Sequence, residues 1–457
     1  MHSRRLLLLV LVAALFSRVS SARDVPLASS QFPELASLPD ETEAFQMLLA
    51  KSGTLLLPPG THRITSPLEI TLAQSHSVLI RPESGPATLI MDGPGPAIRI
   101  VGSHEGSAAP QTFEPGTWNE RMPLIEGIEI IGNHPEADGI ELIRCVQPTL
   151  EKVVIRWCRH AVHLVERNRN VIISNCHFYE NRGIGVFLDD VNLHQINVAN
   201  SHISYNQAGG IVVIGGNVRN IQITGCDIEA NMPENDQPTT AANILLDVSG
   251  FTDDKTRSIA EVAITGCTIQ HSSNYSGKDF AQLAPGGANV RFLGNATSPI
   301  DSVTISGNVI GDAALCFDFV HTADLTITGN TLMAPNPDFL YFRDSARFVV
   351  QGNTFHPREF ARPGRLVFER CADSVISNNI FRKLEAPDGV VVLQECSGLA
   401  LGSNVLAQCS SGVRIVSSRQ ISLHDWVITD FPEDALLLET SEDSTEVEVS
   451  RVRKPSK

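Results

Sequence analysis

The hexapeptide Ile305-Ser-Gly-Asn308-Val-Ile310 contains the phrase that decides the fold: an aliphatic residue, two variable residues, then Asn or Cys. Aligned on its last residue, the phrase recurs at intervals of about 25 residues through two thirds of the chain. A fixed period of roughly 20 to 50 residues is typical of solenoids, in which each repeat forms one coil. The aligned last residues are Asn133, Cys158, Cys176, Ser201, Cys226, Cys267, Asn308, Asn330, Asn353, Asn379, Asn404 and Trp426.

The residues before each aligned position indicate strands. All twelve residues three positions earlier are aliphatic, from Ile130 to Leu423, and residues two apart lie on one face of a strand. The Gly307-Asn308 pair suits a tight turn because both residues tolerate positive φ, and stacked Asn side chains can bond the coils above and below. The frames of leucine-rich and helical repeats are absent. The sequence therefore predicts an all-β solenoid of about 12 to 14 parallel coils.

The pattern from Ile128 to Ile428, preceded by Leu55-Leu-Leu-Pro-Pro-Gly-Thr-His62, resembles the single-stranded right-handed parallel β-helix proteins of the pectate-lyase-like superfamily. This scaffold carries lyases, hydrolases, epimerases and binding proteins, so the resemblance implies a fold and no specific enzyme family. Asp189-Asp190 is similar to the paired Asp of polygalacturonases, but the chain has no Gly-His-Gly and no Arg-x-Lys. That activity is not supported.

The chain divides into four predicted segments. Residues 1–22 match a secretory signal peptide, with Arg4 and Arg5 before an apolar run and a small-residue cleavage site at Ser20-Ser-Ala22. We therefore expect a secreted, periplasmic or extracellular protein with no membrane insertion after cleavage. The remaining segments are an N-terminal cap and lead-in at 23–75, the β-helix at 76–450 and a polar tail at 451–457.

The lead-in segment contains a predicted capping helix, Thr42 to Lys51. Asp40 followed by Glu43 resembles a capping box, and Ala44, Phe45, Leu48 and Leu49 would lie on one face. A helix there would cover the open end of the core.

Charge restricts the partners. Without Arg4, Arg5 and Arg18 the chain carries 32 basic and 51 acidic residues, a net charge of −19. Nucleic acid is an unfavourable partner because phosphate backbones require a basic face. An acidic polysaccharide would require a local basic cluster or a bridging Ca²⁺, whereas a neutral one would require neither. Beyond that conditional Ca²⁺, the sequence indicates no cofactor and no metal site.

The nine cysteines are predicted to fill the core rather than to form a disulfide framework. Four of them occupy the turn position that Asn fills later in the chain, and Cys is among the most buried residue types. Cys371 and Cys396 close strands at matching positions, so a bond between these two stays open.

Two consecutive intervals of 41 residues mark long insertions. They place loops at residues 229–243 and 270–289, with a further excursion from Gly250 to Ser258. Long loops from adjacent coils would stand side by side on an otherwise regular rod, and loops on rigid scaffolds often carry function. A groove beside these loops is the predicted site.

The strands below the loops supply the catalytic candidates Asp247, Arg291, Asp318 and Arg343. One outward column is predicted to contain Asp247, Leu293, Asp318, Arg343 and Glu369, and the neighbouring column to contain Leu245, Arg291, Cys316, Tyr341 and Val367. Asp247 and Asp318 would then lie roughly 9 to 10 Å apart, which suits an inverting glycoside hydrolase. Arg291 could instead serve a β-elimination on a uronate polymer. Alternating charges along a sheet also form ordinary cross-strand pairs, and this structural interpretation stays open.

Seven further residues are predicted to bind substrate, from the loops and from the strand face. A metal site at His160 and His163, with Glu166 nearby, is disfavoured because the strand supplies no clear further ligand. Together these features predict a polysaccharide lyase or glycoside hydrolase; the alternative is a non-catalytic glycan-binding or cell-surface adhesion module. The substrate-binding candidates are Glu180, Arg182, Tyr205, His271, Tyr275, Lys278 and Tyr341.

Overall fold

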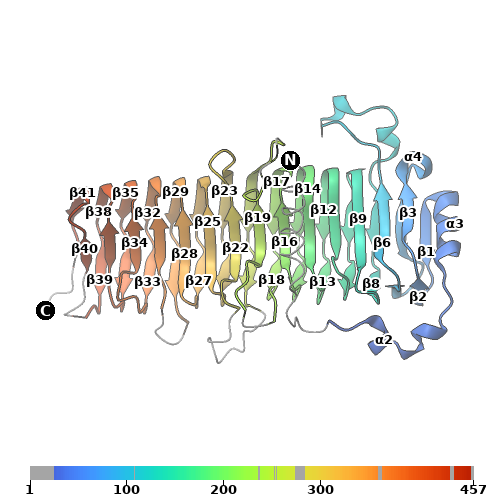
Figure 1. Ribbon diagram of the computed structural model, residues 1–457, viewed down its shortest axis with the longest axis horizontal. Coiled ribbons are helices and arrows are strands. Elements are labelled where there is room, and N and C mark those ends of the chain that lie inside the picture. Colours follow the sequence, from blue (N-terminus) through green and yellow to red (C-terminus); the bar gives the residue numbers. More distant parts are fainter. Residues whose placement is uncertain are drawn as a thin grey trace, which may run out of the picture.

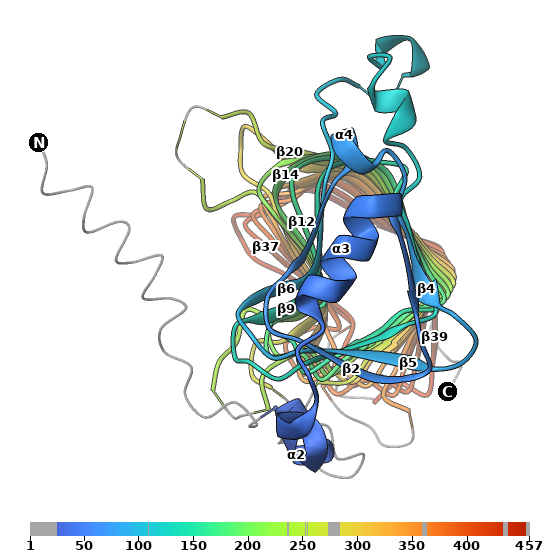
Figure 2. The same cartoon turned by 90° about the vertical axis from the view of Figure 1, so that its right-hand side faces the viewer.

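The computed structural model is an elongated parallel β-solenoid (Figure 1). It describes residues 25–453 except 108, 235–236, 252, 254, 273–283, 359–362 and 433–436. The predicted signal peptide and residues 454–457 of the tail lie outside the described residues. Each coil contributes strands to three faces that surround one core (Figure 2).

The first face is a parallel sheet that continues through the C-terminal halves of the long strands β12 and β14. Its other strands are β1 (Thr54–Leu57), β4 (Leu79–Pro82), β7 (Leu124–Glu126), β10 (Thr149–Glu151), β17 (Asn217–Thr224), β20 (Ser258–Thr265), β23 (Ile300–Ser306), β26 (Thr322–Thr328), β29 (Ala346–Gln351), β32 (Ala372–Ser377), β35 (Ser397–Gly402), β38 (Arg419–His424) and β41 (Thr445–Ser450).

The second face is a separate sheet with 14 strands among the described residues, which agrees with the predicted number of coils. These strands are β2 (Gly60–Ile64), β5 (Ala87–Met91), β8 (Glu129–Gly132), β11 (Val154–Arg156), β13 (His177–Tyr179), β15 (His202–Ser204), β18 (Asp227–Glu229), β21 (Thr268–Gln270), β24 (Val309–Gly311), β27 (Thr331–Met333), β30 (Thr354–His356), β33 (Ile380–Arg382), β36 (Val405–Ala407) and β39 (Val427–Thr429).

The third face carries the candidate site. Its strands are β3 (Leu68–Thr71), β6 (Gly95–Val101), β9 (Ala137–Val146), β12 (Val162–Ser174), β14 (Ile184–Ala199), β16 (Gly209–Ile214), β19 (Ala242–Asp247), β22 (Ala288–Leu293), β25 (Leu315–Val320), β28 (Asp338–Arg343), β31 (Leu366–Glu369), β34 (Val391–Gln394), β37 (Val413–Val416) and β40 (Leu438–Thr440).

The aliphatic file that predicted the fold lies inside the solenoid. Ile223, Ile264, Ile305 and Ile327 are Cα partners on successive strands of the first face, and each is fully buried. The stacked-coil architecture predicted from the phrase is confirmed.

An asparagine ladder closes the turn between the first and second faces. The Nδ2 group of Asn308 donates to Oδ1 of Asn330 at 2.9 Å, and the same bond repeats from Asn330 to Asn353, from Asn353 to Asn379 and from Asn379 to Asn404. Each Oδ1 also accepts the backbone N–H of the preceding coil, as between Asn308 and Asn330 at 3.0 Å. The ladder therefore satisfies buried turn backbone that the strands leave unpaired.

The first two aligned phrases belong to a different corner. Ile130 and Ile155 are Cα partners on the second face, where Ile155 also pairs with Phe178. Their phrases therefore end at the corner between the second and third faces, and the short interval of 18 residues between Cys158 and Cys176 marks this change of corner. A second ladder runs there, which the sequence analysis did not identify, through Asn181, Asn206, Asn231, Asn243 and Asn289.

The predicted capping helix is present as α3 (Thr42–Ser52) and lies across the N-terminal end of the core (Figure 2). Phe45 and Leu49 are buried against the first coil, whereas Leu48 is exposed. The capping-box prediction is wrong. Glu41 is the N-cap residue and makes no side-chain cap bond, and its carboxylate pairs with His62 at 2.8 Å. The Asp40 carboxylate accepts bonds from Thr42 and Thr65.

Among the described residues, the other helices are α2 (Ala28–Gln31), η1 (Pro33–Ser37), α4 (Leu72–Ser75), η2 (Pro110–Thr112) and η3 (Thr117–Asn119). Helix α4 connects β3 to β4 and buries Leu72 in the main core. Ala28 and Leu35 pack on the outer surface of the second face against Ile90, Ile131 and Trp157. Within the described part of the chain, no helix has the length and apolar character needed to cross a membrane.

All nine cysteines are buried free thiols, so the core interpretation of these residues is confirmed. Cys371 and Cys396 are stacked neighbours that interact through their side chains without a disulfide.

Candidate functional site

One outward file of side chains runs along the third face. The strand register places one residue of this file on each successive coil. A charged N-terminal section (Glu69 to His163) and a charged C-terminal section (Arg291 to Tyr341) lie on either side of three apolar residues. In chain order the file is Glu69, Arg99, Glu141, His163, Phe187, Val212, Leu245, Arg291, Asp318, Tyr341 and Val367.

This register corrects the position predicted for Asp318. Asp318 is the Cα partner of Arg291 and Tyr341, whereas Asp247 lies in the neighbouring file, opposite Leu293. The predicted pairing of Asp247 with Asp318 across the site is therefore wrong. The error arises at β25, where apolar residues occupy three alternate positions, Leu315, Phe317 and Phe319. A slip of two residues keeps every side chain on its face, so the alternation alone could not fix the register.

Arg291 and Asp318 form a buried clamp for the two long loops. Arg291 Nε donates to Asp318 Oδ2 at 2.7 Å, and the two residues are only 5% and 6% exposed. The other guanidinium nitrogens donate to the carbonyls of Thr240 and Gly286, both at 2.6 Å. These carbonyls lie at the ends of the two predicted loops, which are also joined by a bond from Thr239 N to Pro285 O. The clamp therefore fixes both loops to the strand face.

The other catalytic candidates on these coils are more exposed. Arg343 Nη2 contacts Asp318 Oδ1 at 3.1 Å, and its guanidinium lies 4.8 Å from the Tyr341 ring centre. Tyr341 donates its hydroxyl proton to Glu369 at 2.8 Å. Asp247 accepts bonds from the backbone and hydroxyl of Ser249, both at 2.7 Å. Arg343 and Tyr341 therefore adjoin the clamp, and Asp247 lies in the neighbouring file.

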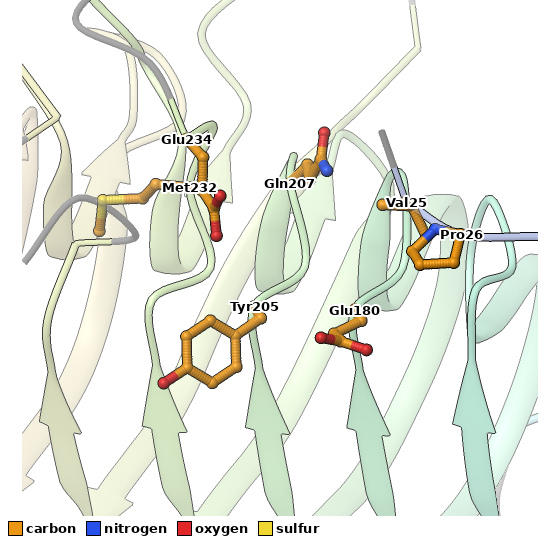
Figure 3. A pocket seen from close by; sticks show the side chains of 7 residues that line it. All are labelled: Val25, Pro26, Glu180, Tyr205, Gln207, Met232 and Glu234. Carbon is orange, nitrogen blue, oxygen red and sulfur yellow. The ribbon is translucent and has the colours of Figure 1, made fainter. Parts of the chain in front are cut away.

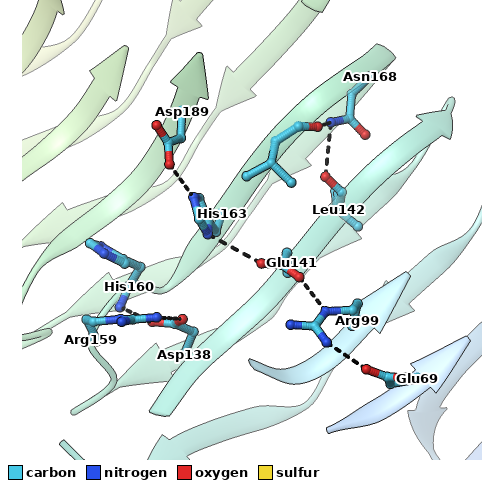
Figure 4. A network of polar contacts seen from close by, with 11 residues as sticks. Glu69, Arg99, Asp138, Glu141, Leu142, Arg159, His160, His163, Asn168 and Asp189 are labelled. Carbon is cyan, nitrogen blue, oxygen red and sulfur yellow. Dashed lines mark hydrogen bonds and ion pairs between the residues drawn. The ribbon is translucent and has the colours of Figure 1, made fainter. Parts of the chain in front are cut away.

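The N-terminal section of the file forms an acid–base network (Figure 4). His163 lies between two carboxylates, with Nε2 at 3.2 Å from Asp189 Oδ2 and Nδ1 at 3.5 Å from Glu141 Oε2. Glu141 also accepts a bond from Arg99 at 2.5 Å, and Arg99 reaches Glu69 at 2.6 Å. The His163 ring stacks on Phe187, with centres 5.1 Å apart. The network spans five coils of one face.

The two histidines of this network differ in charge. Burial alone would lower the pKa of His163, but its bonds to Asp189 and Glu141 and their negative charges raise it to about 9. Burial lowers the pKa of His160 to about 4, and its Nδ1 accepts the backbone N–H of Ile184 at 3.1 Å. The bond from His163 lowers the pKa of Glu141, against the opposing effect of burial. At neutral pH the network therefore holds an imidazolium between two carboxylates, beside a neutral imidazole.

A further ion pair borders the network. Asp138 is buried and accepts two bonds from Arg159, at 2.9 and 2.5 Å, as well as the backbone N–H of His160 at 3.0 Å. The sequence pattern suggested His160 and His163 only as part of a disfavoured metal site, and Glu141 and Arg99 were not predicted as their neighbours. The available signal was the spacing of about 23 residues between Glu141, His163 and Phe187. Within the described residues, no group of three or more His, Cys, Asp or Glu is placed to hold a metal ion.

The excursion near residue 250 forms one wall of this face. Its Arg257 is 7% exposed and donates to Asp190 at 2.8 and 3.0 Å, while Gly216 N donates to the same carboxylate at 2.9 Å. The Arg257 guanidinium lies 3.7 Å from the ring centre of Phe251. Because Asp190 follows Asp189 directly, the excursion reaches back two coils to the strand end that carries the acid–base network.

Two predicted substrate residues share a shallow pocket at the corner between the second and third faces (Figure 3). Glu180 and Tyr205 lie on consecutive coils and line it with Met232 and Glu234 from the loop at 229–243. Arg182 does not line this pocket. Its guanidinium donates to the carbonyls of Trp157, Val25 and Pro26, so it fixes the N-terminal segment along the pocket edge.

The last candidates belong to the loop at 270–289. His271 lies 3.8 Å from Glu229 and 3.6 Å from the fully buried Asp312. Burial and the nearby Arg358 lower the pKa of His271 to about 4. Tyr275 and Lys278 lie outside the described residues.

Comparison with known proteins identifies the fold. The family described as right handed beta helix region matches residues 118–249 and 250–428. Among solved structures, tailspike protein 3 of bacteriophage CBA120 is 12% identical with a TM-score of 0.48, over 96% of this chain and 65% of the tailspike.

Two further structures show the range of similar proteins. A PL6 alginate lyase is 13% identical with a TM-score of 0.42, over 91% and 84% of the two chains. The surface adhesin PfbA of Streptococcus pneumoniae is 11% identical with a TM-score of 0.38, over 91% and 90%. No curated protein matches the sequence.

Proposed function

The chain belongs to the right-handed β-helix family, and from this premise we propose that it is an exported carbohydrate-active protein that cleaves a polysaccharide on its third face. The observation that carries the proposal is the arrangement of Glu141, His163 and Asp189 on consecutive coils of an outward face. Parallel coils present equivalent positions about every 4.8 Å, so a linear polymer lying along the rod would meet successive subsites.

The network supplies groups for acid–base chemistry. His163 is protonated at neutral pH, so it can donate a proton to a leaving oxygen or pair with a substrate carboxylate. Asp189 has a side chain that is 44% exposed, against 13% for Glu141, and it is the more accessible base. The two carboxylates lie on opposite sides of one imidazole. Inverting glycoside hydrolases likewise use two carboxyl groups, one as acid and the other as base. A lyase would use the same base to remove a proton beside a uronate carboxylate.

The predicted groove extends from this network toward the loops at 229–243 and 270–289. Arg343, Tyr341 and Asp247 would contribute distal subsites there, and Glu180 and Tyr205 would bind sugar at the neighbouring corner. The roles predicted for Arg291 and Asp318 become indirect in this proposal, since their clamp positions the loops. If the polymer is a uronate, a bridging Ca²⁺ would offset the repulsion between its carboxylates and this acidic protein.

A non-catalytic glycan-binding or adhesion module is the second candidate. Pairing within the network favours it: His163 contacts two carboxylates, Arg99 contacts two more, and Arg159 binds Asp138 through two bonds. Charges neutralised in this way can stabilise a sheet face without any catalytic role.

Turnover assays on the mature chain separate the candidates. The protein is incubated with a panel of neutral and uronate polysaccharides, with and without Ca²⁺, and reducing ends and unsaturated products are measured. Asp189→Asn and His163→Gln should each lower turnover about 100-fold or more in protein that remains folded at the assay temperature. Asp324→Asn is the matched control, because it changes an exposed carboxylate on the first face that pairs with Arg347. Glycan binding without turnover under every condition would favour the module.

A further inference from the structure

We propose that Arg167 and Arg169 form a binding site for an oxyanion group at the corner between the third and first faces. Strand β12 bends around this corner, and its register shifts between Val165 and Arg167. Glu166 and Asn170 both adopt left-handed backbone conformations, with φ of 54°, on either side of the two arginines. The bend therefore places two guanidinium groups close together on one turn.

Three buried polar atoms of this turn lack protein partners. Nη1 of Arg167, Nε of Arg169 and Oδ1 of Asn170 are buried without a hydrogen-bond partner among the residues that the structure describes. Arg169 is 2% exposed and uses its other nitrogens on Asn192, donating at 2.7 Å to the backbone carbonyl and at 2.9 Å to Oδ1. Leaving a buried donor unpaired is costly, and more so when it is charged.

The nearby acidic side chains are already engaged. Glu166 and Glu105 both pair with Arg144, at 2.7 and 3.2 Å, and Glu120 accepts bonds from the backbone and hydroxyl of Ser103. Burial and the charges of Arg169 and Arg167 lower the pKa of His104, which lies under the same corner. This locally cationic corner contrasts with the formal net charge of −16 for the whole chain.

Arg219, on the same corner, has a purely structural role. Arg219 donates from Nη1 to the carbonyls of Val218 and Ser258 and from Nη2 to the Ser258 hydroxyl, at 2.8 to 3.0 Å. None of its nitrogens is among the buried atoms without partners. The side chain of Arg167, by contrast, makes no hydrogen bond or ion pair within the described part of the chain.

A ligand that fits this turn carries an oxyanion and a hydroxyl group. Guanidinium nitrogens match carboxylate, sulfate or phosphate oxygens, and the Asn170 oxygen can accept a hydroxyl proton. Acidic sugars carry both groups, whereas sulfate carries only the first. Arg167 also lies four residues beyond His163 on β12, roughly 13 Å along the strand. The acidic-glycan assignment rests on the proposed function, but the oxyanion site does not.

The first experiment tests the oxyanion site with sulfate. Binding to the mature chain is measured by calorimetry and by melting temperature, with sodium chloride at matched ionic strength as the reference. Arg167→Gln should weaken sulfate binding about tenfold or more and leave the fold intact, since this side chain has no protein partner. Arg419→Gln removes one exposed positive charge elsewhere and should change nothing. Equal stabilisation by sulfate and chloride, or equal effects of the two variants, would overturn the site.

The second experiment identifies the source of the oxyanion. Uronate oligosaccharides are compared with neutral oligosaccharides of the same length, and only the former should lose affinity in Arg167→Gln. Sulfate binding that depends on Arg167 in a protein that binds no glycan would retain the site and refute the proposed function. Glycan turnover without any dependence of sulfate binding on Arg167 would refute the site and retain the function.

Discussion

The two charged sections of the third-face file both contain an arginine paired with a carboxylate, but these pairs have different surroundings. In the C-terminal section, Arg291 and Asp318 are almost completely buried beneath the ends of two loops. In the N-terminal section, the side chains of Glu69 and Arg99 are 59% and 31% exposed, and Asp189, which contacts His163 from the neighbouring file, is 44% exposed. Loop anchoring therefore distinguishes the two sections, and charge at an outward position does not by itself identify a site.

Every coil of a regular solenoid has the same outward positions, so only the surroundings of these positions differ. An ion pair covered by loops has few free lone pairs and little access, so it stabilises the fold. An ion pair left open can exchange its partner for a substrate. The variants that follow test whether a given ion pair is covered by loops (the covered class) or exposed to solvent (the open class).

The largest effect is expected for Asp318→Asn. This change leaves the Arg291 guanidinium buried without its carboxylate, and breaking a buried pair from one side costs about 3 to 5 kcal/mol in free energy of unfolding. Urea unfolding followed by circular dichroism measures the loss. Asp324→Asn, in a half-exposed pair on the first face, should cost less than about 1 kcal/mol. Equal costs for the two variants would show that Asp318 is not part of a buried clamp.

The open section should make stability depend on pH. The folded pKa of His163 is about 9, above the ordinary value of 6.5. Its stabilising contribution is therefore complete below pH 6.5 and is lost as pH rises through 9, with an upper limit of about 3 kcal/mol.

The measurement compares wild type with His163→Gln in urea from pH 6 to 10. The difference between their unfolding free energies should shrink across this window, and NMR titration should place the His163 transition near its upper end. A constant difference would mean that the imidazole is not held as a cation between Glu141 and Asp189.

The chain has two periods, that of the coil and that of the strand, and they explain which parts of the fold and of the site the sequence predicted. The coil period fixed the fold and the interior file, because Ile223, Ile264, Ile305 and Ile327 repeat at a detectable interval. The period of two within a strand fixed which side chains point outward. It could not fix which outward residues pair across strands, because a slip of two residues preserves the pattern. Such a slip on β25 placed Asp318 beside Leu293, whereas it pairs with Arg291.

The same slip hid the acid–base network. Phe187 pairs with Val212, and Asp189 pairs with Ile214, but the alternation of apolar residues alone is equally compatible with a pairing of Phe187 with Ile214. Burial was also not predictable from spacing: the clamp of Arg291 depends on backbone carbonyls at 240 and 286, which carry no side-chain signal. The long intervals correctly located the loops, but they did not show that the loop ends would cover the residues beneath them.

A smaller effect is expected where the excursion near residue 250 meets Asp190. Asp190→Asn weakens the bonds from Arg257 but leaves its contact with Asp253, so the cost should be about 1 to 2 kcal/mol. The Gly216 amide, which donates to the same carboxylate, should exchange its hydrogen about tenfold faster. Unchanged exchange at Gly216 would show that this carboxylate does not hold the wall beside the network.

The smallest effect is expected for Arg343, which lies between the two classes. Its side chain is 34% exposed and contacts Asp318 at 3.1 Å, so Arg343→Gln should cost less than about 1 kcal/mol of unfolding free energy. Arg291→Gln should cost several times more, because it removes the buried member of the same cluster. If Arg343 is a distal subsite, its loss should weaken glycan binding while stability stays near wild type. Equal destabilisation by the two arginine variants would place Arg343 in the covered clamp and shorten the proposed groove.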